Sequence, residues 1–197
     1  MLKKVYLIFL TAFLGFAAKA QSADSVYNKY LDFNLARFEG DHDKVYELGE
    51  DLLPYADKLP EKTRVSFYFS IGKMYEDDNQ PQKAIGYYEK VALAVPNYYV
   101  VHRALGYLYL ADVRAIETKL NAATDYKTNH EITIACNRAV HKALPHLEKA
   151  QACDPSDETL AIIKMLYQNI KDINGLNSLD DRLKDLGKNC MDILEDK

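Results

Sequence analysis

The spacing of apolar residues is the feature that most limits how this chain can fold. Beyond residue 21, apolar residues recur at intervals of three and four positions rather than at alternate positions, which is the pattern of amphipathic helices. Short polar turns, such as residues 40–43 and 76–81, separate these helical segments. Asp and Asn in the turns can cap the following helix, and Pro81 suits a first helical turn. The sequence therefore predicts an all-α fold built from helix pairs.

The clearest pair runs from Thr63 to Pro96 and carries aromatic and small residues at fixed positions. These positions are Tyr68, Ile71, Gly72, Tyr75, Ala84 and Tyr88. Their spacing resembles that of the tetratricopeptide repeat. The resemblance implies two antiparallel helices that approach closely at Gly72, with tyrosines filling the gap between neighbouring helices. Ala84 is expected to be small because the first helix crosses over it.

The next unit repeats the pattern with an insertion. Ala143 lies 37 residues after Gly106, whereas Ala84 lies 12 residues after Gly72, so this unit contains 25 extra residues. The apolar pattern within residues 113–137 is helical on both sides of a polar turn. We expect an extended helical hairpin that projects about 15 Å beyond its neighbours, if roughly ten residues lengthen each helix.

Weaker repeats flank these two units. A helical stripe precedes them, and a capping pair follows them, with a final helix expected to carry Leu179, Leu183, Leu186 and Leu194. We therefore predict one domain, residues 21–197, divided into units 22–60, 61–97, 98–155 and 156–197. The resemblance implies a right-handed superhelix of about three to four such units, with a concave face lined by the first helix of each.

Residues 1–20 have the three parts of a secretory signal peptide. Two lysines give a basic start, an apolar run extends from Val5 to Ala18, and Ala18-Lys19-Ala20 forms a cleavage pattern ahead of Gln21. An uncleaved membrane anchor is the alternative, but the run is shorter than the ~20 residues that span a bilayer. We predict an exported protein, periplasmic or secreted, with no stable membrane insertion after cleavage.

The charge and motif content argue against several functions. Cleavage would leave 25 minus 3, or 22, basic residues against 29 acidic ones, a net charge near −7. An acidic surface repels phosphates, and no basic block stands out, so no nucleic-acid partner is expected. The chain has no GxSxG turn and no glycine-rich phosphate loop, which are common supports of nucleophilic and phosphate chemistry. We therefore expect neither an enzyme nor a cofactor.

One histidine-rich segment is the strongest candidate for a metal site. Its possible ligands are His130, Glu131, Cys136, His141 and His146. Ligands that share one helical face lie three or four residues apart, whereas the last three of these residues lie five apart and point in different directions. The spacing therefore predicts surface histidines and no metal site.

The three cysteines leave at least one thiol unpaired within a single chain. Cys136 and Cys153 are expected on one helix, where 17 residues separate them by roughly 25 Å, too far for a disulfide. Any internal disulfide must then include Cys190. The favoured interpretation is three buried thiols that take part in no chemistry.

The resemblance implies a function in binding, because members of this family usually hold a protein or peptide in the concave groove. The residues expected to line this groove are Tyr30, Asn34, Arg37, Phe69, Lys73, Arg103, Tyr107 and Leu110. Aromatic anchors among cations suit an extended, somewhat acidic peptide. The alternative is a structural subunit of an envelope assembly or a homodimer, in which the groove and the inserted hairpin form permanent interfaces.

Overall fold

The computed structural model describes residues 22–194, and this part of the chain is helical throughout, with no β-strand. The helices are α1 (Ala23–Glu39), α2 (His42–Leu52), the 3-10 helix η1 (Leu53–Lys58), α3 (Glu61–Asp77), α4 (Pro81–Ala94), α5 (Tyr99–Ala122), α6 (Tyr126–Cys153), α7 (Asp157–Asn169), α8 (Ile173–Asn177) and α9 (Leu179–Leu186). The all-α fold class is thereby confirmed. The predicted signal peptide lies outside the described residues. None of the described helices is long and apolar enough to cross a membrane.

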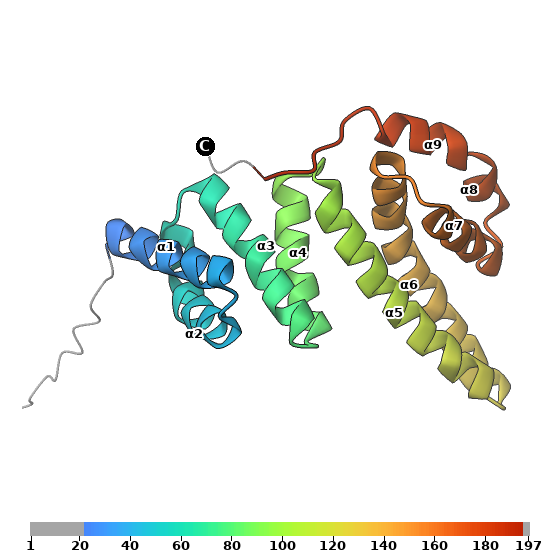
Figure 1. The fold of residues 1–197 in the computed structure, drawn as a ribbon. Helices are drawn as coiled ribbons and strands as arrows, with labels where there is room; N and C mark the ends of the chain where they lie inside the picture. Colours follow the sequence, from blue (N-terminus) through green and yellow to red (C-terminus); the bar gives the residue numbers. More distant parts are fainter. Residues whose placement is uncertain (1–21, 195–197) are drawn as a thin grey trace, which may run out of the picture.

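The first six α-helices pack as three successive hairpins, α1 with α2, α3 with α4, and α5 with α6 (Figure 1). The turns explain where the helices stop. Gly40 ends α1 with a φ of 73°, a conformation that glycine adopts without strain, and the Asp41 side chain caps α2 by accepting from the Lys44 N–H at 3.1 Å. Pro81 occupies the first turn of α4, where a missing N–H costs no hydrogen bond.

Two glycines allow the helices of a hairpin to approach each other. A Cβ atom on Gly72 would lie 2.6 Å from the ring of Tyr88, and one on Gly106 would lie 2.8 Å from Leu147 Cδ2. Neither distance leaves room for a side chain. The expectation that Gly72 permits close approach is confirmed, and Ala84 is fully buried in the same hairpin.

The α5–α6 hairpin is the longest part of the fold. Its helices contain 24 and 28 residues, compared with 17 and 14 in α3 and α4. Residues 124–131 at its tip are exposed, and the hairpin extends past the ends of the neighbouring helices (Figure 1). The prediction that the inserted residues form a helical extension is confirmed.

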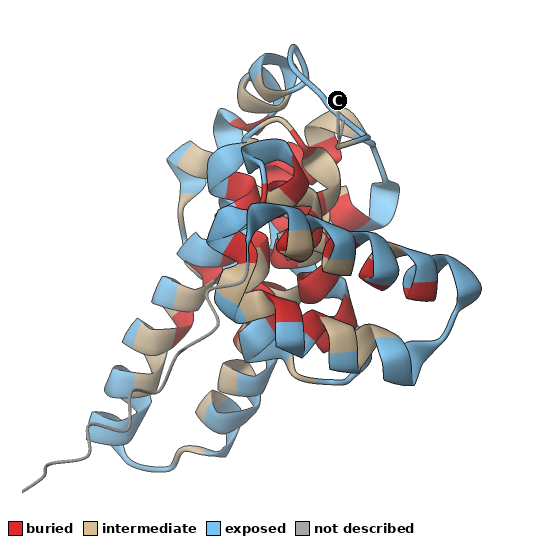
Figure 2. Ribbon diagram, turned by 90° about the vertical axis from the view of Figure 1, so that its left-hand side faces the viewer, coloured by how far each residue is buried: buried red, intermediate tan, exposed pale blue. Residues whose placement is uncertain are grey.

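The core is one continuous cluster that runs through the helix pairs (Figure 2). A tyrosine–glutamate contact recurs between one pair and the next. Tyr75 on α3 donates to Glu50 on α2, Tyr109 on α5 donates to Glu89 on α4, and Tyr167 on α7 donates to Glu148 on α6. In each case, the first helix of one unit is joined to the last α-helix of the unit before it.

The C-terminal region differs from the predicted capping pair. The final helix, α9, ends at Leu186 instead of continuing to Leu194. Residues 187–194, which we call the C-terminal strap, leave α9 and cross back over the α4–α5 turn toward the start of α3 (Figure 1). The apolar spacing through Leu194 reflects packing of this strap against the core, not another helical turn.

Candidate binding site

A surface pocket lies between the first two helix pairs. It has a volume of about 610 Å³ and is formed by the α1–α2 turn, the start of α2 and the second half of α3. Its lining residues are Arg37, Gly40, His42, Asp43, Val45, Tyr46, Ser70, Lys73, Met74, Asp77 and Asp78. We call this the α1–α3 pocket.

Two of the residues predicted to line a groove, Arg37 and Lys73, line this pocket, and a third, Asn34, is hydrogen-bonded to Arg37. Arg37 Nη1 donates to Asn34 Oδ1 at 2.9 Å, and the Arg37 guanidinium lies 5.8 Å from the centre of the Phe33 ring. Lys73 Nζ forms an ion pair with Asp77 Oδ1 at 2.5 Å, and this hydrogen bond raises the pKa of Lys73. The two cations therefore have fixed partners while their charged groups remain at the surface.

The charges of the α1–α3 pocket are nearly balanced. Arg37 and Lys73 stand against Asp43, Asp77 and Asp78, while Val45, Tyr46 and Met74 supply an apolar wall. The aspartates remove the excess positive charge that an acidic ligand would require. This geometry provides hydrogen-bond donors and acceptors beside an apolar surface, which suits recognition of a mixed polar and apolar segment.

Two of the predicted groove residues belong to the core. Tyr30 is 4% exposed and Leu110 is 1% exposed. The Tyr30 ring packs edge-on against Phe67, with centroids 6.3 Å apart. The prediction that these side chains line an open groove is wrong, because the helical phase assigned from sequence placed a core-facing stripe at the surface.

The remaining groove residues do not face one another across a single surface. Phe69 is half-buried between the rings of Tyr88 and Tyr98, with centroid distances of 5.7 and 5.2 Å. Arg103 forms an ion pair with Asp154, and the Tyr107 hydroxyl lies 2.9 Å from Thr159 Oγ1 on α7. Arg103 therefore contacts the end of its own unit, and Tyr107 contacts the last unit.

A buried polar network joins the last helices to α6. Glu148, whose side chain is 6% exposed, accepts from Arg182 Nε at 3.0 Å, from Arg182 Nη2 at 2.7 Å and from the Tyr167 hydroxyl at 2.5 Å. Arg182 Nη1 also donates to the Gly175 carbonyl at 2.9 Å. Sequence reasoning missed this network. Its signal was a Glu–Lys pair, residues 148–149, inside an otherwise apolar helical stretch.

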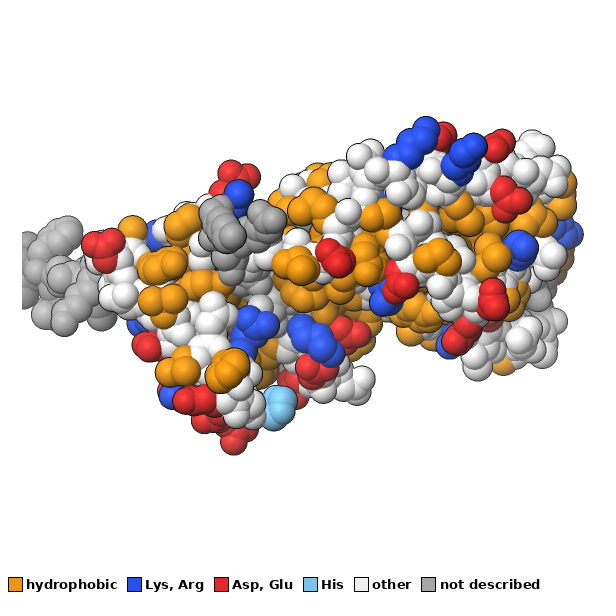
Figure 3. All heavy atoms as spheres, turned by 45° about the horizontal axis from the view of Figure 1, so that its top comes forward, with side chains coloured by type: hydrophobic (Ala, Val, Ile, Leu, Met, Phe, Trp, Pro, Cys, Tyr) orange, Lys and Arg blue, Asp and Glu red, His pale blue; other side chains and the backbone are white. Residues whose placement is uncertain are grey.

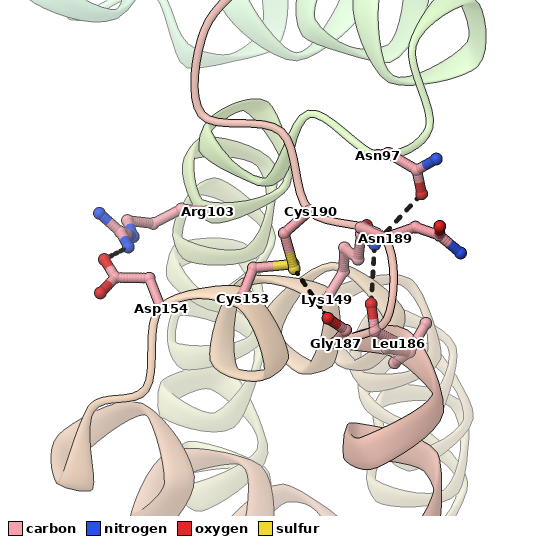
Figure 4. Close-up of a disulfide and its surroundings, with 9 residues drawn as sticks. All are labelled: Asn97, Arg103, Lys149, Cys153, Asp154, Leu186, Gly187, Asn189 and Cys190. Carbon is pink, nitrogen blue, oxygen red and sulfur yellow. Dashed lines mark hydrogen bonds and ion pairs between the residues drawn. A yellow bond between two sulfur atoms is a disulfide. The ribbon is translucent and has the colours of Figure 1, made fainter.

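A disulfide joins Cys153 at the end of α6 to Cys190 in the C-terminal strap, with Cα atoms 5.6 Å apart (Figure 4). The interpretation of three unreactive thiols is therefore wrong for this pair, whereas the inference that any internal disulfide includes Cys190 is confirmed. Cys136 is buried and free, on the same helix as Cys153. Burial raises the pKa of the Cys136 thiol.

Two of the histidines, His102 and His146, form a pair. His102 Nδ1 and His146 Nδ1 lie 2.9 Å apart between α5 and α6, and His102 Nε2 is buried without a hydrogen-bond partner. Burial, and to a smaller extent the neighbouring His146, lower the pKa of His102 to about 4. Over residues 22–194, no three His, Cys, Asp or Glu side chains are placed to hold a metal ion together.

The chain was compared with protein-family models, with curated proteins and with solved structures, and nothing matches it. The candidate site is therefore defined by the geometry of this molecule alone.

Proposed function

We propose that this chain is an exported repeat protein of the tetratricopeptide type that binds a protein or peptide and catalyses no reaction. The successive antiparallel hairpins support this proposal. So do the close approach at Gly72 and Gly106 and the tyrosine–glutamate contact repeated between three pairs of neighbouring units. A right-handed superhelix of these units is part of the proposal.

The α1–α3 pocket is the single observation that carries the binding function. It places two partnered cations, three carboxylates and an apolar wall at the surface between two helix pairs. Concave surfaces that combine an apolar wall with a few placed polar groups are the usual form of recognition sites. We propose that Asn34, Arg37 and Lys73 contact the partner there.

Export is supported by the disulfide independently of the N-terminal residues. Structural disulfides persist in oxidising environments and are rare in reducing ones. The Cys153–Cys190 bond joins two segments 37 residues apart in sequence and ties the strap to the rest of the fold. We propose that the protein works in the periplasm or outside the cell.

A pull-down from the cell-envelope extract tests this function. The immobilised mature protein should capture a partner, and both Arg37→Ala and Lys73→Ala should reduce the captured amount by about tenfold or more. The control is Lys164→Ala, which removes an exposed cation from α7, away from the pocket. Equal capture by all four proteins would exclude the α1–α3 pocket as the contact.

A second function, assembly as a structural subunit or homodimer, is favoured by one surface. Tyr27, Leu31, Leu35 and Phe38 form a stripe along α1 and are 41, 48, 50 and 91% exposed. In Figure 3, apolar side chains are exposed at the N-terminal end of the molecule as well as over the rest of this face. End units of repeat proteins usually present a polar outer face. An apolar outer face on α1 therefore favours packing against a second copy of this chain. Light scattering of the mature protein and of Leu31→Asp distinguishes a dimer that dissociates on substitution from a monomer.

A further inference from the structure

We propose that the surface beneath the C-terminal strap is a second binding site, specific for an extended peptide with an apolar residue at the position of Leu194, and that reduction of the Cys153–Cys190 disulfide opens it. In the described structure, the strap itself occupies this site. The strap therefore shows which chemistry the site recognises. This inference is separate from the α1–α3 pocket and does not depend on it.

The first recognition element is main-chain pairing. Met191 N donates to the Asn97 carbonyl at 2.8 Å, and Tyr99 N donates to the Met191 carbonyl at 3.1 Å, which makes a parallel bridge between Met191 and Tyr98. These bonds involve only the backbone of the strap. Any extended peptide can form them, as in recognition by added strands.

The second element is an apolar seat beside this bridge. A pocket of about 360 Å³ is lined by Glu61, Lys62, Val65, Ala94 and Val95, together with Met191 and Leu194 of the strap. Leu194 packs against the core, but Met191 remains 39% exposed. The strap therefore fills its own seat incompletely, and a peptide with the same spacing can compete for it.

The third element is a buried cation that holds carbonyl groups. The Lys149 side chain is buried, and its Nζ donates to Asn97 Oδ1 at 3.3 Å, to the Leu186 carbonyl at 2.9 Å and to the Asn189 carbonyl at 2.5 Å (Figure 4). Departure of the strap removes the Asn189 carbonyl from this ammonium group. Because a buried ammonium group that loses one of its three acceptors is left with an unsatisfied N–H, which is costly, the open site favours a peptide carbonyl in that position.

The disulfide is the covalent lock on the strap. Only Gly187 to Asn189 separate the end of α9 from Cys190. Apart from the disulfide, the strap is held by the Lys149–Asn189 hydrogen bond, the bridge at Met191 and the packing of Leu194. Chain ends with so few contacts stay ordered only when they are tied down. Once the disulfide is reduced, the strap dissociates from the apolar pocket for part of the time.

A dithiol protein is the class of reductant required. Cys190 is exposed and Cys153 is partly exposed, so a reductant thiolate can attack Cys190 Sγ, form a mixed disulfide and displace the Cys153 thiolate. The second thiol of the reductant then attacks the mixed disulfide and releases the Cys190 thiolate. Both cysteine thiolates take up protons, and the reductant leaves as its own disulfide.

Fluorescence anisotropy tests the proposal with a labelled peptide, Asn-Ser-Met-Asp-Ile-Leu, which copies residues 189–194 with serine in place of cysteine. We expect the peptide to bind the dithiothreitol-reduced mature protein and the Cys190→Ser variant at least tenfold more tightly than the oxidised protein. A peptide ending in Asp instead of Leu is the ligand control and should bind at least tenfold more weakly. Circular dichroism checks that each protein keeps its helices.

The site is located by a matched pair of substitutions in the Cys190→Ser background. Ala94→Arg places a long cation in the seat from an exposed position and should abolish peptide binding. Ala161→Arg makes the same change at an exposed position on α7 and should leave binding unchanged. Equal affinity of oxidised and reduced protein, no binding to either open form, or binding that survives Ala94→Arg would each overturn the proposal.

Discussion

The Glu148–Arg182 pair is expected to contribute far more to stability than any surface ion pair of this protein. Glu148 is almost fully buried and accepts two bonds from Arg182 and one from Tyr167. Removal of one partner from such a pair leaves the other partner as an uncompensated charge, which lowers the free energy of unfolding by about 3–5 kcal/mol when both groups are buried. Because the Arg182 side chain is 33% exposed, water can partly replace Glu148. We expect Glu148→Ala to cost about 2–4 kcal/mol.

A double-mutant cycle with Glu148→Ala and Arg182→Ala isolates the pairwise term. Urea unfolding of the oxidised protein, followed by circular dichroism, should give a coupling energy of at least about 1.5 kcal/mol. The matched cycle uses Lys73→Ala and Asp77→Ala, whose side chains are 57% and 53% exposed; its coupling should be about 0.3–0.5 kcal/mol. Equal coupling energies in the two cycles would refute the argument that burial sets the strength of the first pair.

Three further predictions follow from the described contacts. Burial lowers the folded-state pKa of both His102 and His146, so the unfolded chain binds protons at a higher pH than the folded chain does. The contribution of these histidines to the free energy of unfolding should be complete above about pH 6.5 and should decrease as the pH drops toward about 4. The melting temperature of His102→Leu should decrease less over the same pH range. Gly106→Leu forces a side chain into Leu147 and should lower the free energy of unfolding by about 3 kcal/mol or more. Tyr107→Ala removes one contact to Thr159 and should lower it by about 1–2 kcal/mol. Urea unfolding measures both values. Residues 118–132 can be deleted and replaced by a short turn. Because most of their side chains are exposed, the melting temperature should shift by only a few degrees, roughly equivalent to 1 kcal/mol. Global unfolding of this variant would show that the hairpin tip supports the core.

The helix pairs could be predicted from sequence because their determinants are local. Apolar spacing, capping residues and proline position act within one or two helical turns. Gly72 and Gly106 are informative because each sits where two helices of one hairpin meet. The displacement of Ala143 by 25 residues located the long hairpin for the same reason: the spacing within each helix was preserved around the insertion.

The face that each helix presents to solvent could not be predicted as well, because the neighbouring units determine it. Tyr30 and Leu110 satisfy the helical period of an exposed stripe, yet the adjoining helices cover them. Arg103 and Tyr107 lie on the first helix of their unit, as expected, but Arg103 pairs with Asp154 at the end of the same unit and Tyr107 contacts Thr159 in the unit that follows. A periodic pattern fixes relative positions on one helix and leaves its rotation toward the next helix undetermined.

The C-terminal strap was not predicted because the spacing of its apolar side chain and of those in α9 matches the period of a helix. Leucines at 179, 183, 186 and 194 are compatible with helical spacing, although the chain is no longer helical after Leu186. The contacts that hold it extended, the bridge to Tyr98 and the bond to Cys153, come from residues distant in sequence. The charged side chain of Lys149 is buried, and its Nζ donates to the carbonyl groups of Leu186 and Asn189.

Helix α3 contributes to both proposed binding surfaces, and this arrangement makes them separable by experiment. Its first two turns supply Glu61 and Val65 to the seat of the strap, and its second half supplies Ser70 and Lys73 to the α1–α3 pocket, with no lining residue in common. Lys73→Ala should therefore weaken capture of the envelope partner and leave binding of the strap peptide intact. Ala94→Arg should have the opposite effect. If both variants impaired both activities, the two surfaces would have to be one continuous site along α3, and the strap would then be a direct competitor of the partner.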